Sequence, residues 1–323
     1  MFGSSIPALS RRWPGTFPAI LGAAAILGAA PAHAQAPAAC ASAPVTAIAP
    51  GVYVRPGQHG VVFEAANVAN VGFIVGEDCV AVVDTGGSER EGRHLDCAIR
   101  EVTDRPVCFV INTHMHPDHI LGNRAFRRPG VEFVGHAKLA EALAFAGATY
   151  LTRAAVHEGR VLPDDYLVVP ERTAATELQL DLGNRGLRVT AHPTAHTTND
   201  LTVLDEKSGT LWAGDLVFLE HIPVLNGSVS GWLQVLDTLS RHTALRVVPG
   251  HGPAQARWPE AQVPTRRYLG ILRDEVRAWL KTGNDLRDAQ SNLGYSEKPE
   301  WRLFEDYHRR NVAAAFAELE WED

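Results

Sequence analysis

The chain is short of positive charge, of paired cysteines and of long apolar runs. Its 30 Lys and Arg residues face 37 Asp and Glu residues, so the net charge is −7. A surface that binds nucleic acid must neutralise many phosphates, so nucleic acid is not an expected partner. The four cysteines contain no C-x-x-C pair, which argues against a cysteine zinc site. No glycine-rich loop that could hold phosphates stands out either.

The first 34 residues have the layout of a cleaved secretory signal. A basic start at Arg11 and Arg12 precedes an apolar stretch over 17–30 and the small-residue ending Ala32-His33-Ala34. A membrane anchor is the alternative, but a spanning helix needs about 20 apolar residues, and prolines bound a shorter stretch here. We therefore expect residues 1–34 to be removed by cleavage. The mature protein is then expected to have no membrane segment and to be periplasmic or secreted.

The four cysteines all follow that signal, and disulfides persist in exported proteins. Cys79 opens the apolar run 80–83, and Cys108 opens the apolar run 109–111. If these runs are adjacent parallel strands, Cys79 and Cys108 lie within disulfide reach. The alternative is that all four cysteines are small buried apolar side chains, and it stays open.

The remaining chain divides into a lead-in, a strand-rich domain over 50–255 and a C-terminal helical extension over 256–323. Residues 35–49 are rich in Ala, Pro and Ser, which predicts a flexible lead-in. Tyr, Trp, Phe and aliphatic residues at helical spacing predict the C-terminal helices, which would pack on the domain and supply scaffolding or one wall of a substrate cleft. Short β-branched runs bounded by glycine predict strands at 51–54, 61–63, 71–75, 80–84, 107–112, 178–182, 187–191, 201–204, 210–213 and 245–248. A helical segment over 88–102 between two of these strands predicts a parallel crossover.

The most informative stretch is Thr113-His114-Met115-His116-Pro117-Asp118-His119, directly after a predicted strand. Side chains two apart in an extended segment point the same way, so His114 and His116 can bind one cation. Pro117 forces a turn, which turns Asp118 and His119 toward a different side, suited to a second cation. Imidazole and carboxylate ligands suit zinc and, less selectively, iron or manganese.

Three further residues of ligand type follow predicted strands: His196, Asp215 and His251. Together with the histidine stretch they resemble the motifs of the metallo-β-lactamase superfamily, matched in order over roughly 48–255. The resemblance implies an α/β fold, a four-layer αβ/βα sandwich, here followed by C-terminal helices. It also implies a metal-dependent hydrolase with two Zn²⁺ ions, with Fe or Mn as possible substitutes.

The resemblance assigns the ligands residue by residue. One metal would be held by His114, His116 and His196, the other by Asp118, His119 and His251, and Asp215 would bridge them. His192 is a rival to His196, which is preferred because the superfamily's ligand is typically followed by threonine, here Thr197. Asp84 in Val83-Asp84-Thr85-Gly86 would support the site from behind the ligands, as would Thr197. His221 lies in a segment that lines the cleft in this superfamily and is a candidate substrate contact.

An aspartate at position 215 is typical of glyoxalase II and lactonase-type hydrolases, whereas zinc β-lactamases typically carry Cys or Ser there. The sequence resembles most closely exported zinc metallohydrolases of quinoprotein dehydrogenase systems, relatives of a sulfur-oxidation accessory protein. The residues that carry this likeness are the opening 49–55, the stretch 112–123 and the segment 220–228. A quinoprotein dehydrogenase system is thus a possible partner, and the small-molecule substrate stays unnamed.

The expected reaction is attack by hydroxide on an ester, thioester, lactone or amide carbonyl, with Asp118 or Asp215 as catalytic residues that hold the nucleophile and relay a proton. Two alternatives remain. One is a non-haem iron dioxygenase acting on persulfides, which uses one iron with two histidines and an aspartate. The other is an accessory binding protein in which the metals only stabilise the fold.

Overall fold

The computed structural model describes residue 15 and residues 40–65, 67–283 and 285–322. The predicted signal segment 1–34 therefore lies outside the described residues, apart from residue 15. Within the described residues, no helix combines the length and apolarity that crossing a bilayer requires. Residues 40–323 form one compact unit.

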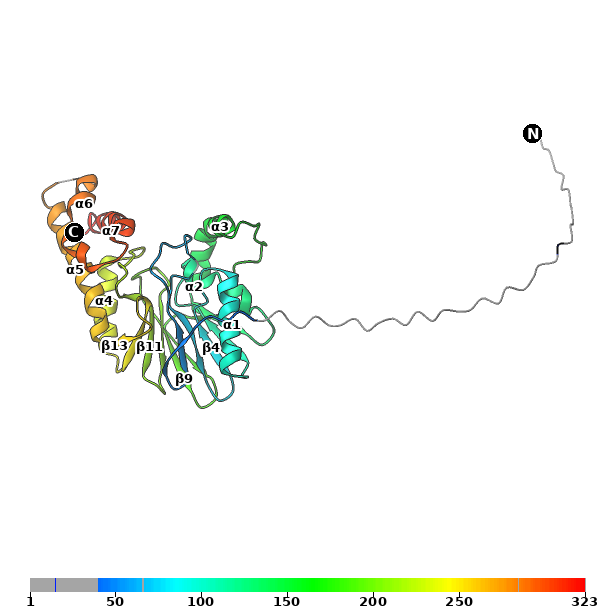
Figure 1. Cartoon of the computed structure of the whole chain (residues 1–323). Helices are drawn as coiled ribbons and strands as arrows, with labels where there is room; N and C mark the ends of the chain where they lie inside the picture. Colours follow the sequence, from blue (N-terminus) through cyan, green and yellow to red (C-terminus); the bar gives the residue numbers. More distant parts are fainter. Residues whose placement is uncertain (1–14, 16–39, 66, 284, 323) are drawn as a thin grey trace, which may run out of the picture. The chain divides into compact units, whose positions relative to one another are not determined.

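Two mixed sheets form the centre of this unit (Figure 1). In the first sheet the strands follow one another in chain order from β1 to β7, and pairing changes from antiparallel to parallel at β4–β5. In the second sheet the order is β13-β12-β11-β10-β9-β8, and among these described strands only β11 and β12 pair in parallel. The strands are β1 (Thr46–Ala49), β2 (Val52–Arg55), β3 (Val71–Val75), β4 (Val80–Val83), β5 (Val107–Ile111), β6 (Glu132–His136), β7 (Arg172–Ala174), β8 (Glu177–Asp181), β9 (Gly186–Ala191), β10 (Leu201–Asp205), β11 (Thr210–Phe218), β12 (Arg246–His251) and β13 (Ala256–Arg257).

Helices cover the outer face of each sheet (Figure 1). The helices are α1 (Glu89–Val102), α2 (Pro117–Ile120), α3 (Leu139–Glu158), α4 (Val229–Leu239), α5 (Val263–Leu280), α6 (Leu286–Asn292) and α7 (Phe304–Leu319), with short 3-10 turns at η1 (Asn123–Phe126), η2 (Glu260–Gln262) and η3 (Tyr295–Glu300). The helix α1 links the parallel strands β4 and β5, as the crossover prediction requires.

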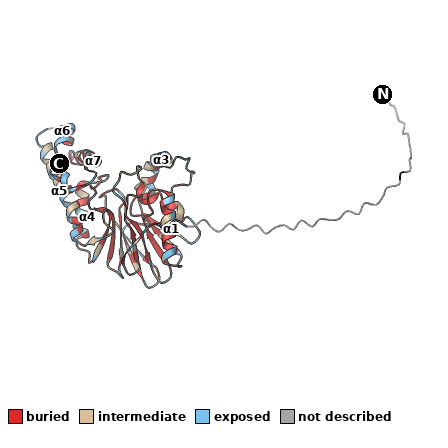
Figure 2. Cartoon of the chain, in the orientation of Figure 1, coloured by how far each residue is buried: buried red, intermediate tan, exposed pale blue. Residues whose placement is uncertain are grey.

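Alternating side chains divide the hydrophobic core into layers. Along β4, Ala81 and Val83 face the second sheet, whereas Val80 and Val82 face α1, because successive strand residues point to opposite sides. Trp212 of β11 fills the space between the two sheets. Strands are accordingly buried on both faces, as Figure 2 shows. The predicted four-layer α/β sandwich is confirmed.

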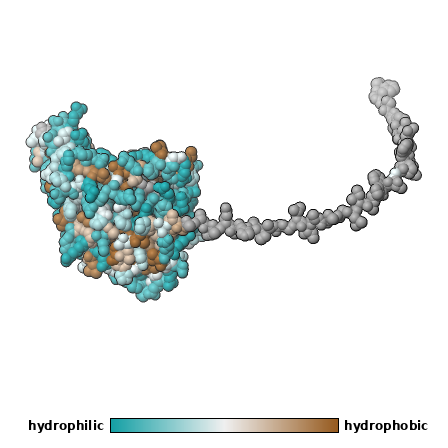
Figure 3. All heavy atoms as spheres, viewed as in Figure 1, coloured by the Kyte–Doolittle hydropathy of each residue, from teal (hydrophilic) through white to brown (hydrophobic). Residues whose placement is uncertain are grey.

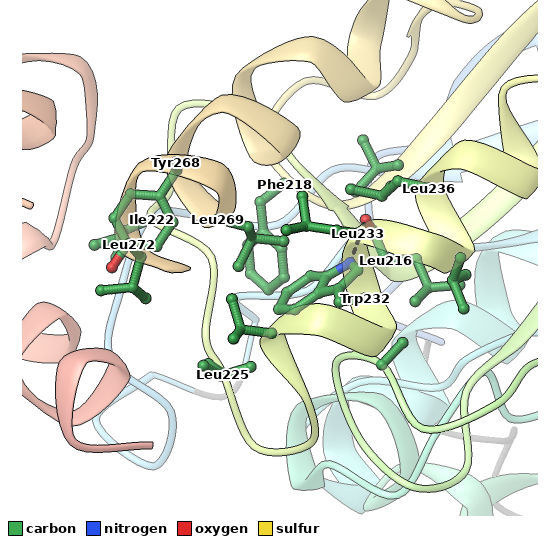
Figure 4. Packing of buried hydrophobic residues seen from close by; sticks show 14 of the residues in the cluster. Leu216, Phe218, Ile222, Leu225, Trp232, Leu233, Leu236, Tyr268, Leu269 and Leu272 are labelled. Carbon is green, nitrogen blue, oxygen red and sulfur yellow. Dashed lines mark hydrogen bonds between the residues drawn. The ribbon is translucent and has the colours of Figure 1, made fainter. Parts of the chain in front are cut away.

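A third core lies between the second sheet and the C-terminal helices (Figure 4). Trp232 of α4 is fully buried there and donates a hydrogen bond from Nε1 to the Leu216 carbonyl over 3.0 Å. Tyr268 of α5 and Phe218 of β11 belong to the same cluster. The apolar residues that predict helices in the last third of the chain therefore form a buried packing face. The outer surface of these helices is largely hydrophilic (Figure 3).

Within residues 40–65, the structure corrects one predicted strand and the end of the predicted lead-in. The segment 61–63 is not a strand: Phe63 has a φ of 70°, and Val62 forms an isolated bridge to Ala65. The lead-in predicted over 35–49 is ordered at its end, because Thr46–Ala49 forms β1 and pairs with β2. The surrounding alanine- and proline-rich composition hid this strand, which forms by pairing with β2 and by packing Ile48 into the core between the sheets.

One disulfide joins two strands of the first sheet, and the other joins residue 40 to the helix α1. Cys79 and Cys108 are bonded, with 5.8 Å between their Cα atoms, at the start of the adjacent parallel strands β4 and β5. The structure thus decides between the two alternatives that the sequence left open, in favour of the bond. A second bond joins Cys40 to Cys97 on α1, and sequence patterns do not indicate it because Cys40 lies in a segment without periodicity.

Removing the disulfide between Cys79 and Cys108 should lower the free energy of unfolding. The bond closes a loop with a sequence separation of 29 residues. Closing a loop of that size reduces the conformational entropy of the unfolded chain, which stabilises the folded state by about 3–4 kcal/mol. Urea unfolding of Cys79→Ser/Cys108→Ser, followed by tryptophan fluorescence, should show this loss. Equal stability of the variant and the oxidised wild type would contradict a structural role for the bond.

Candidate metal centre

The histidine stretch folds as a sharp turn at the end of a buried strand. The strand β5 ends at Ile111, and α2 begins at Pro117 with His116 as its N-terminal flanking residue. Proline suits the first position of a helix because its missing N–H would have no partner there. His114 and His116 therefore lie before the turn, and Asp118 and His119 lie within it. The predicted division of these four side chains follows from that geometry.

Two groups of ligand-type side chains meet at this turn. The first group contains His114, His116, His196 and Asp215, and the second contains Asp118, His119 and His251; in each group the ligand atoms lie within 4.8 Å of one another. His196 comes from the loop between β9 and β10, Asp215 from β11 and His251 from the last position of β12. All seven predicted ligand residues are thus brought together.

Asp215 lies between the two groups. Its Oδ2 is 3.3 Å from His196 Nε2 and 3.6 Å from His114 Nε2. Its Oδ1 is 3.2 Å from His119 Nε2 and 3.4 Å from His251 Nε2. Each oxygen thus faces a different group, which is the arrangement a bridging carboxylate needs.

A distortion of the strand β11 makes room for Asp215. Its pairing with β12 shifts register on both sides of Gly214. A Cβ atom on Gly250 of β12 would lie 2.0 Å from Asp215 Oδ1, so only glycine allows β12 to pass this closely. The strand predicted over 210–213 in fact continues through the aspartate to Phe218.

The far nitrogen of three of these histidines is held by a fixed partner. His119 Nδ1 donates to Asp84 Oδ2 over 2.8 Å, His251 Nδ1 donates to the Val68 carbonyl over 3.0 Å, and His196 Nδ1 donates to the Val224 carbonyl over 2.6 Å. These bonds turn the Nε2 atoms toward the centre of the groups. Metal-binding histidines are typically oriented in this way.

Asp84 is the common support behind His119 and His114. It also accepts hydrogen bonds from the Thr113 backbone N–H over 2.8 Å and from the Thr113 hydroxyl over 2.7 Å. Since that hydroxyl donates to Asp84, its lone pair can accept from His114 Nδ1, which lies 3.0 Å away. The predicted supporting role of Asp84 thus has a structural basis.

Thr197 supports the site through the backbone. Its hydroxyl and its N–H both donate to Asp200, over 2.7 and 2.8 Å, and these bonds fix the turn that follows His196. His192, the rival ligand, lies outside both groups, and its Nε2 is 2.9 Å from the Thr202 hydroxyl. Burial lowers the pKa of His192 to about 4, so it is a neutral structural histidine.

The groups fit cations because several buried atoms lack any other partner. Among the described residues, the buried side-chain atoms without a hydrogen-bond partner include His114 Nε2, Asp118 Oδ2, His119 Nε2 and Asp215 Oδ1. Leaving such atoms buried and unpaired costs free energy. All four belong to the ligand groups, so a bound divalent ion would satisfy them.

The electrostatics of the groups point the same way. Burial and, to a smaller extent, nearby His196 lower the pKa of His116 to about 3. Burial alone would lower the pKa of His251 too, but Asp215 and Asp118 outweigh it and raise this pKa to about 9. Burial would raise the pKa of Asp118, yet His119 and His251 hold it at about 2. The two carboxylates therefore demand positive charge, which protons or metal ions can supply.

A cavity of about 200 Å³ opens above the ligand groups. Its lining includes His116, Asp118, Asp215, His221, Asn226 and His251 from the motif segments, and Val61, Val62, Phe63, Pro117, Tyr150, Arg153, Val224, Tyr307 and Arg310 from their surroundings. His221, the candidate substrate contact, is therefore among the lining residues. The C-terminal helix α7 contributes two of the lining residues, so it does form one wall of the cleft.

Sequence patterns do not reveal the lining residues on α3 and α7. Tyr150 and Arg153 of α3, and Tyr307 and Arg310 of α7, belong to no motif and lie far along the chain from the ligands. The sequence around the motifs shows no basic cluster, yet the fold brings two arginines to the cavity. These four lining residues become apparent only from the positions of α3 and α7 in the fold.

The helix α7 also holds the loop that orients His196. Asn311 accepts from the Leu225 N–H over 2.9 Å and donates to the Pro223 carbonyl over 2.6 Å, on either side of Val224. Glu318 accepts from backbone N–H groups at the start of α4, among them Ser230 over 3.1 Å. The carbonyl that fixes His196 is therefore itself fixed by the C-terminal helix.

Comparison with known proteins agrees with this geometry. Residues 66–251 match the family model described as the metallo-beta-lactamase superfamily, and this range contains all seven ligand-type residues. The chain therefore belongs to the metallo-beta-lactamase superfamily, and its metal-binding motif is intact.

Solved structures share the fold. A metallo-beta-lactamase from Pontibacter korlensis is 22% identical, with a TM-score of 0.57 over 70% of this chain and 98% of that one. The inverting sec-alkylsulfatase Pisa1 from Pseudomonas sp. is 15% identical, with a TM-score of 0.67 over 87% of this chain and 51% of that one. Among curated proteins, a linear primary-alkylsulfatase from Pseudomonas sp. is 42% identical over 45 residues. That match spans 14% of this chain and only 8% of the alkylsulfatase.

Replacing Asp84 with asparagine should weaken the centre without disrupting the fold. Asparagine keeps the shape but removes the charge that accepts from His119 and Thr113. Supporting partners of this kind are worth about 10–100-fold in metal affinity or activity. Metal competition against a chelator should show that loss for Asp84→Asn. An unchanged metal affinity would mean that Asp84 only shapes the backbone.

Proposed function

We propose that this protein is an exported dinuclear zinc hydrolase that cleaves an ester, thioester, lactone or amide bond. The observation that carries the proposal is Asp215, whose two oxygens face two complete ligand groups. When bound, two divalent ions would lower the pKa of a water molecule toward ~7 and polarise a carbonyl oxygen. His114, His116 and His196 would hold one ion, and Asp118, His119 and His251 the other.

The remaining residues of the cavity would position the substrate. His221 donates from Nδ1 to the Ile222 carbonyl over 2.6 Å, which leaves its Nε2 as the atom available to a substrate. Tyr307 packs against the His221 ring with 5.3 Å between ring centroids. Asp118 and Asp215, which line the same cavity, would hold the attacking water and take up its proton.

Three observations support zinc, export and the hydrolase class over the alternatives. A related solved structure, the metallo-beta-lactamase FIM-1 from Pseudomonas aeruginosa, is described in a mono-zinc form. The two disulfides fit an oxidising compartment outside the cytoplasm. A single-iron dioxygenase needs two histidines and an aspartate, whereas both ligand groups are complete here. Service to a quinoprotein dehydrogenase system rests on the sequence resemblance at 49–55, 112–123 and 220–228.

Sulfate-ester hydrolysis is a second candidate. The local likeness to a primary-alkylsulfatase, and the fold shared with Pisa1 over 87% of this chain, favour it. The chain covers only about half of Pisa1, so this likeness extends to the common part alone.

Metal analysis and one substrate panel test these functions together. The mature protein should contain two zinc ions per chain and hydrolyse at least one carbonyl substrate among lactones, thioesters, aryl esters and β-lactams. Turnover of a linear alkyl sulfate alone would favour the sulfatase. Iron in the protein, with oxygen consumption in the presence of a persulfide, would overturn the hydrolase proposal in favour of a dioxygenase. Two bound metals with no turnover would favour an accessory binding role.

A further inference from the structure

Two arginines line the cavity from two different helices. Arg153 on α3 and Arg310 on α7 are both exposed side chains. Throughout the part of the chain that the structure describes, neither guanidinium forms a hydrogen bond or an ion pair with another side chain. The carboxylates among the described lining residues are Asp118 and Asp215, and both belong to the ligand groups.

Arg153 is nevertheless held in place. Its guanidinium lies over the Phe63 ring, 4.5 Å from the ring centroid. Phe63 itself lines the cavity, and its left-handed backbone, with a φ of 70°, belongs to the irregular segment that replaces the predicted strand. Stacking on an aromatic ring fixes an arginine without neutralising it. The charge therefore stays available to a ligand.

We infer that Arg153 and Arg310 form an anion-recognition rim, and that the substrate carries a negatively charged group away from the bond that is cleaved. The inference rests on the proposed function and adds a substrate class to it. Guanidinium groups bind planar or tetrahedral oxyanions through paired hydrogen bonds, so carboxylate and sulfonate are the chemistries that fit. Two cations at the mouth of a cavity also concentrate anions there.

Matched aryl esters test this rim. The probes are 4-acetoxybenzoate, 4-acetoxybenzenesulfonate and the neutral methyl 4-acetoxybenzoate, which share the scissile acetate ester and differ in the distant group. For the wild type we expect kcat/KM to be higher for both anions than for the neutral ester. In Arg153→Gln/Arg310→Gln the anion-to-neutral ratio should fall about tenfold, mainly through KM, since each exposed charge pair is worth only a few-fold. Added salt should reduce the wild-type ratio in the same direction.

A neighbouring arginine provides the control. Arg309 is exposed on α7, next to Arg310, but is not among the lining residues of the cavity. Arg309→Gln removes one positive charge, as the single variant Arg310→Gln does, and should leave the ratio unchanged. An equal ratio in the wild type and in the double variant, or an equal fall in Arg309→Gln, would overturn the inference. A preference for only one of the two anions would support the rim and identify the chemistry of the natural group.

Failure of the proposed hydrolase is distinguishable from failure of the rim. If the zinc-loaded protein cleaves none of the three esters, calorimetric binding of 4-methoxybenzoate and 4-methoxybenzenesulfonate still tests the arginines. Affinity should fall about tenfold in the double variant while its zinc content equals that of the wild type. Unchanged affinity for both anions would overturn the rim regardless of the reaction.

Discussion

Asp215→Asn should abolish most of the metal binding and hydrolysis of this protein. Asparagine keeps the size of the side chain but removes the negative charge that faces both ligand groups. Partners that do not even touch a metal are worth about 10–100-fold, so loss of a bridging ligand should cost at least about 100-fold in kcat/KM. Elemental analysis after dialysis and steady-state kinetics on the best substrate of the panel measure both effects.

A histidine outside the ligand groups provides the matched control for this variant. His192→Gln can keep a hydrogen bond to the Thr202 hydroxyl and should retain two metals per chain and full activity. Thermal melts of both variants would separate a lost centre from a lost fold. Supporting partners alone are worth about 10–100-fold in activity. If Asp215→Asn retained two metals and lost less than about tenfold in activity, Asp215 would not be a bridging ligand.

The second large effect is expected far from the metal centre, at the buried ion pair of Arg185 and Asp205. Arg185 donates to both Asp205 oxygens, over 3.0 and 2.6 Å, and to the carbonyls of Val75 and Pro50. It thereby ties the β8–β9 hairpin to the first sheet. Arg185→Met leaves a buried carboxylate without its cation, which should cost about 3–5 kcal/mol of unfolding free energy.

The measurement is urea unfolding of the metal-free protein, so that metal affinity does not enter the comparison. The double variant Arg185→Met/Asp205→Asn should recover part of the loss because no buried charge remains unpaired. Arg188 on β9 lies three residues further along the chain and forms an exposed ion pair with Glu206, so Arg188→Met should change stability by less than about 1 kcal/mol. Equal losses for Arg185→Met and Arg188→Met would contradict this account.

The metal centre was largely predictable because its chemistry is concentrated in short motifs. Four ligand-type residues lie within 114–119, and each remaining ligand follows a predicted strand. The expected adjacency of two strands likewise placed Cys79 and Cys108 within reach of each other, although it left the bond itself open. Local patterns suffice wherever a residue's role is set by its neighbours in the chain.

The parts that escaped prediction depend on contacts between distant segments. The strand β1 forms by pairing with β2, although its composition resembles a flexible linker. The segment 61–63 has the composition of a strand, but Val62 and Phe63 instead form an irregular segment that lines the cavity. Arg153 and Arg310 carry no motif, because their proposed role depends on where α3 and α7 lie in space.

The hydrogen bonds from α7 to the 223–228 loop have a practical consequence for anyone who shortens this protein. The family match ends at residue 251, so the sequence comparison alone would suggest ending a shortened protein at that residue. Such a fragment would discard Asn311, which clamps the segment on either side of Val224, and with it the anchor for His196. Residues beyond the shared domain thus help to orient a metal-ligand candidate and should be kept in any shortened version of the chain.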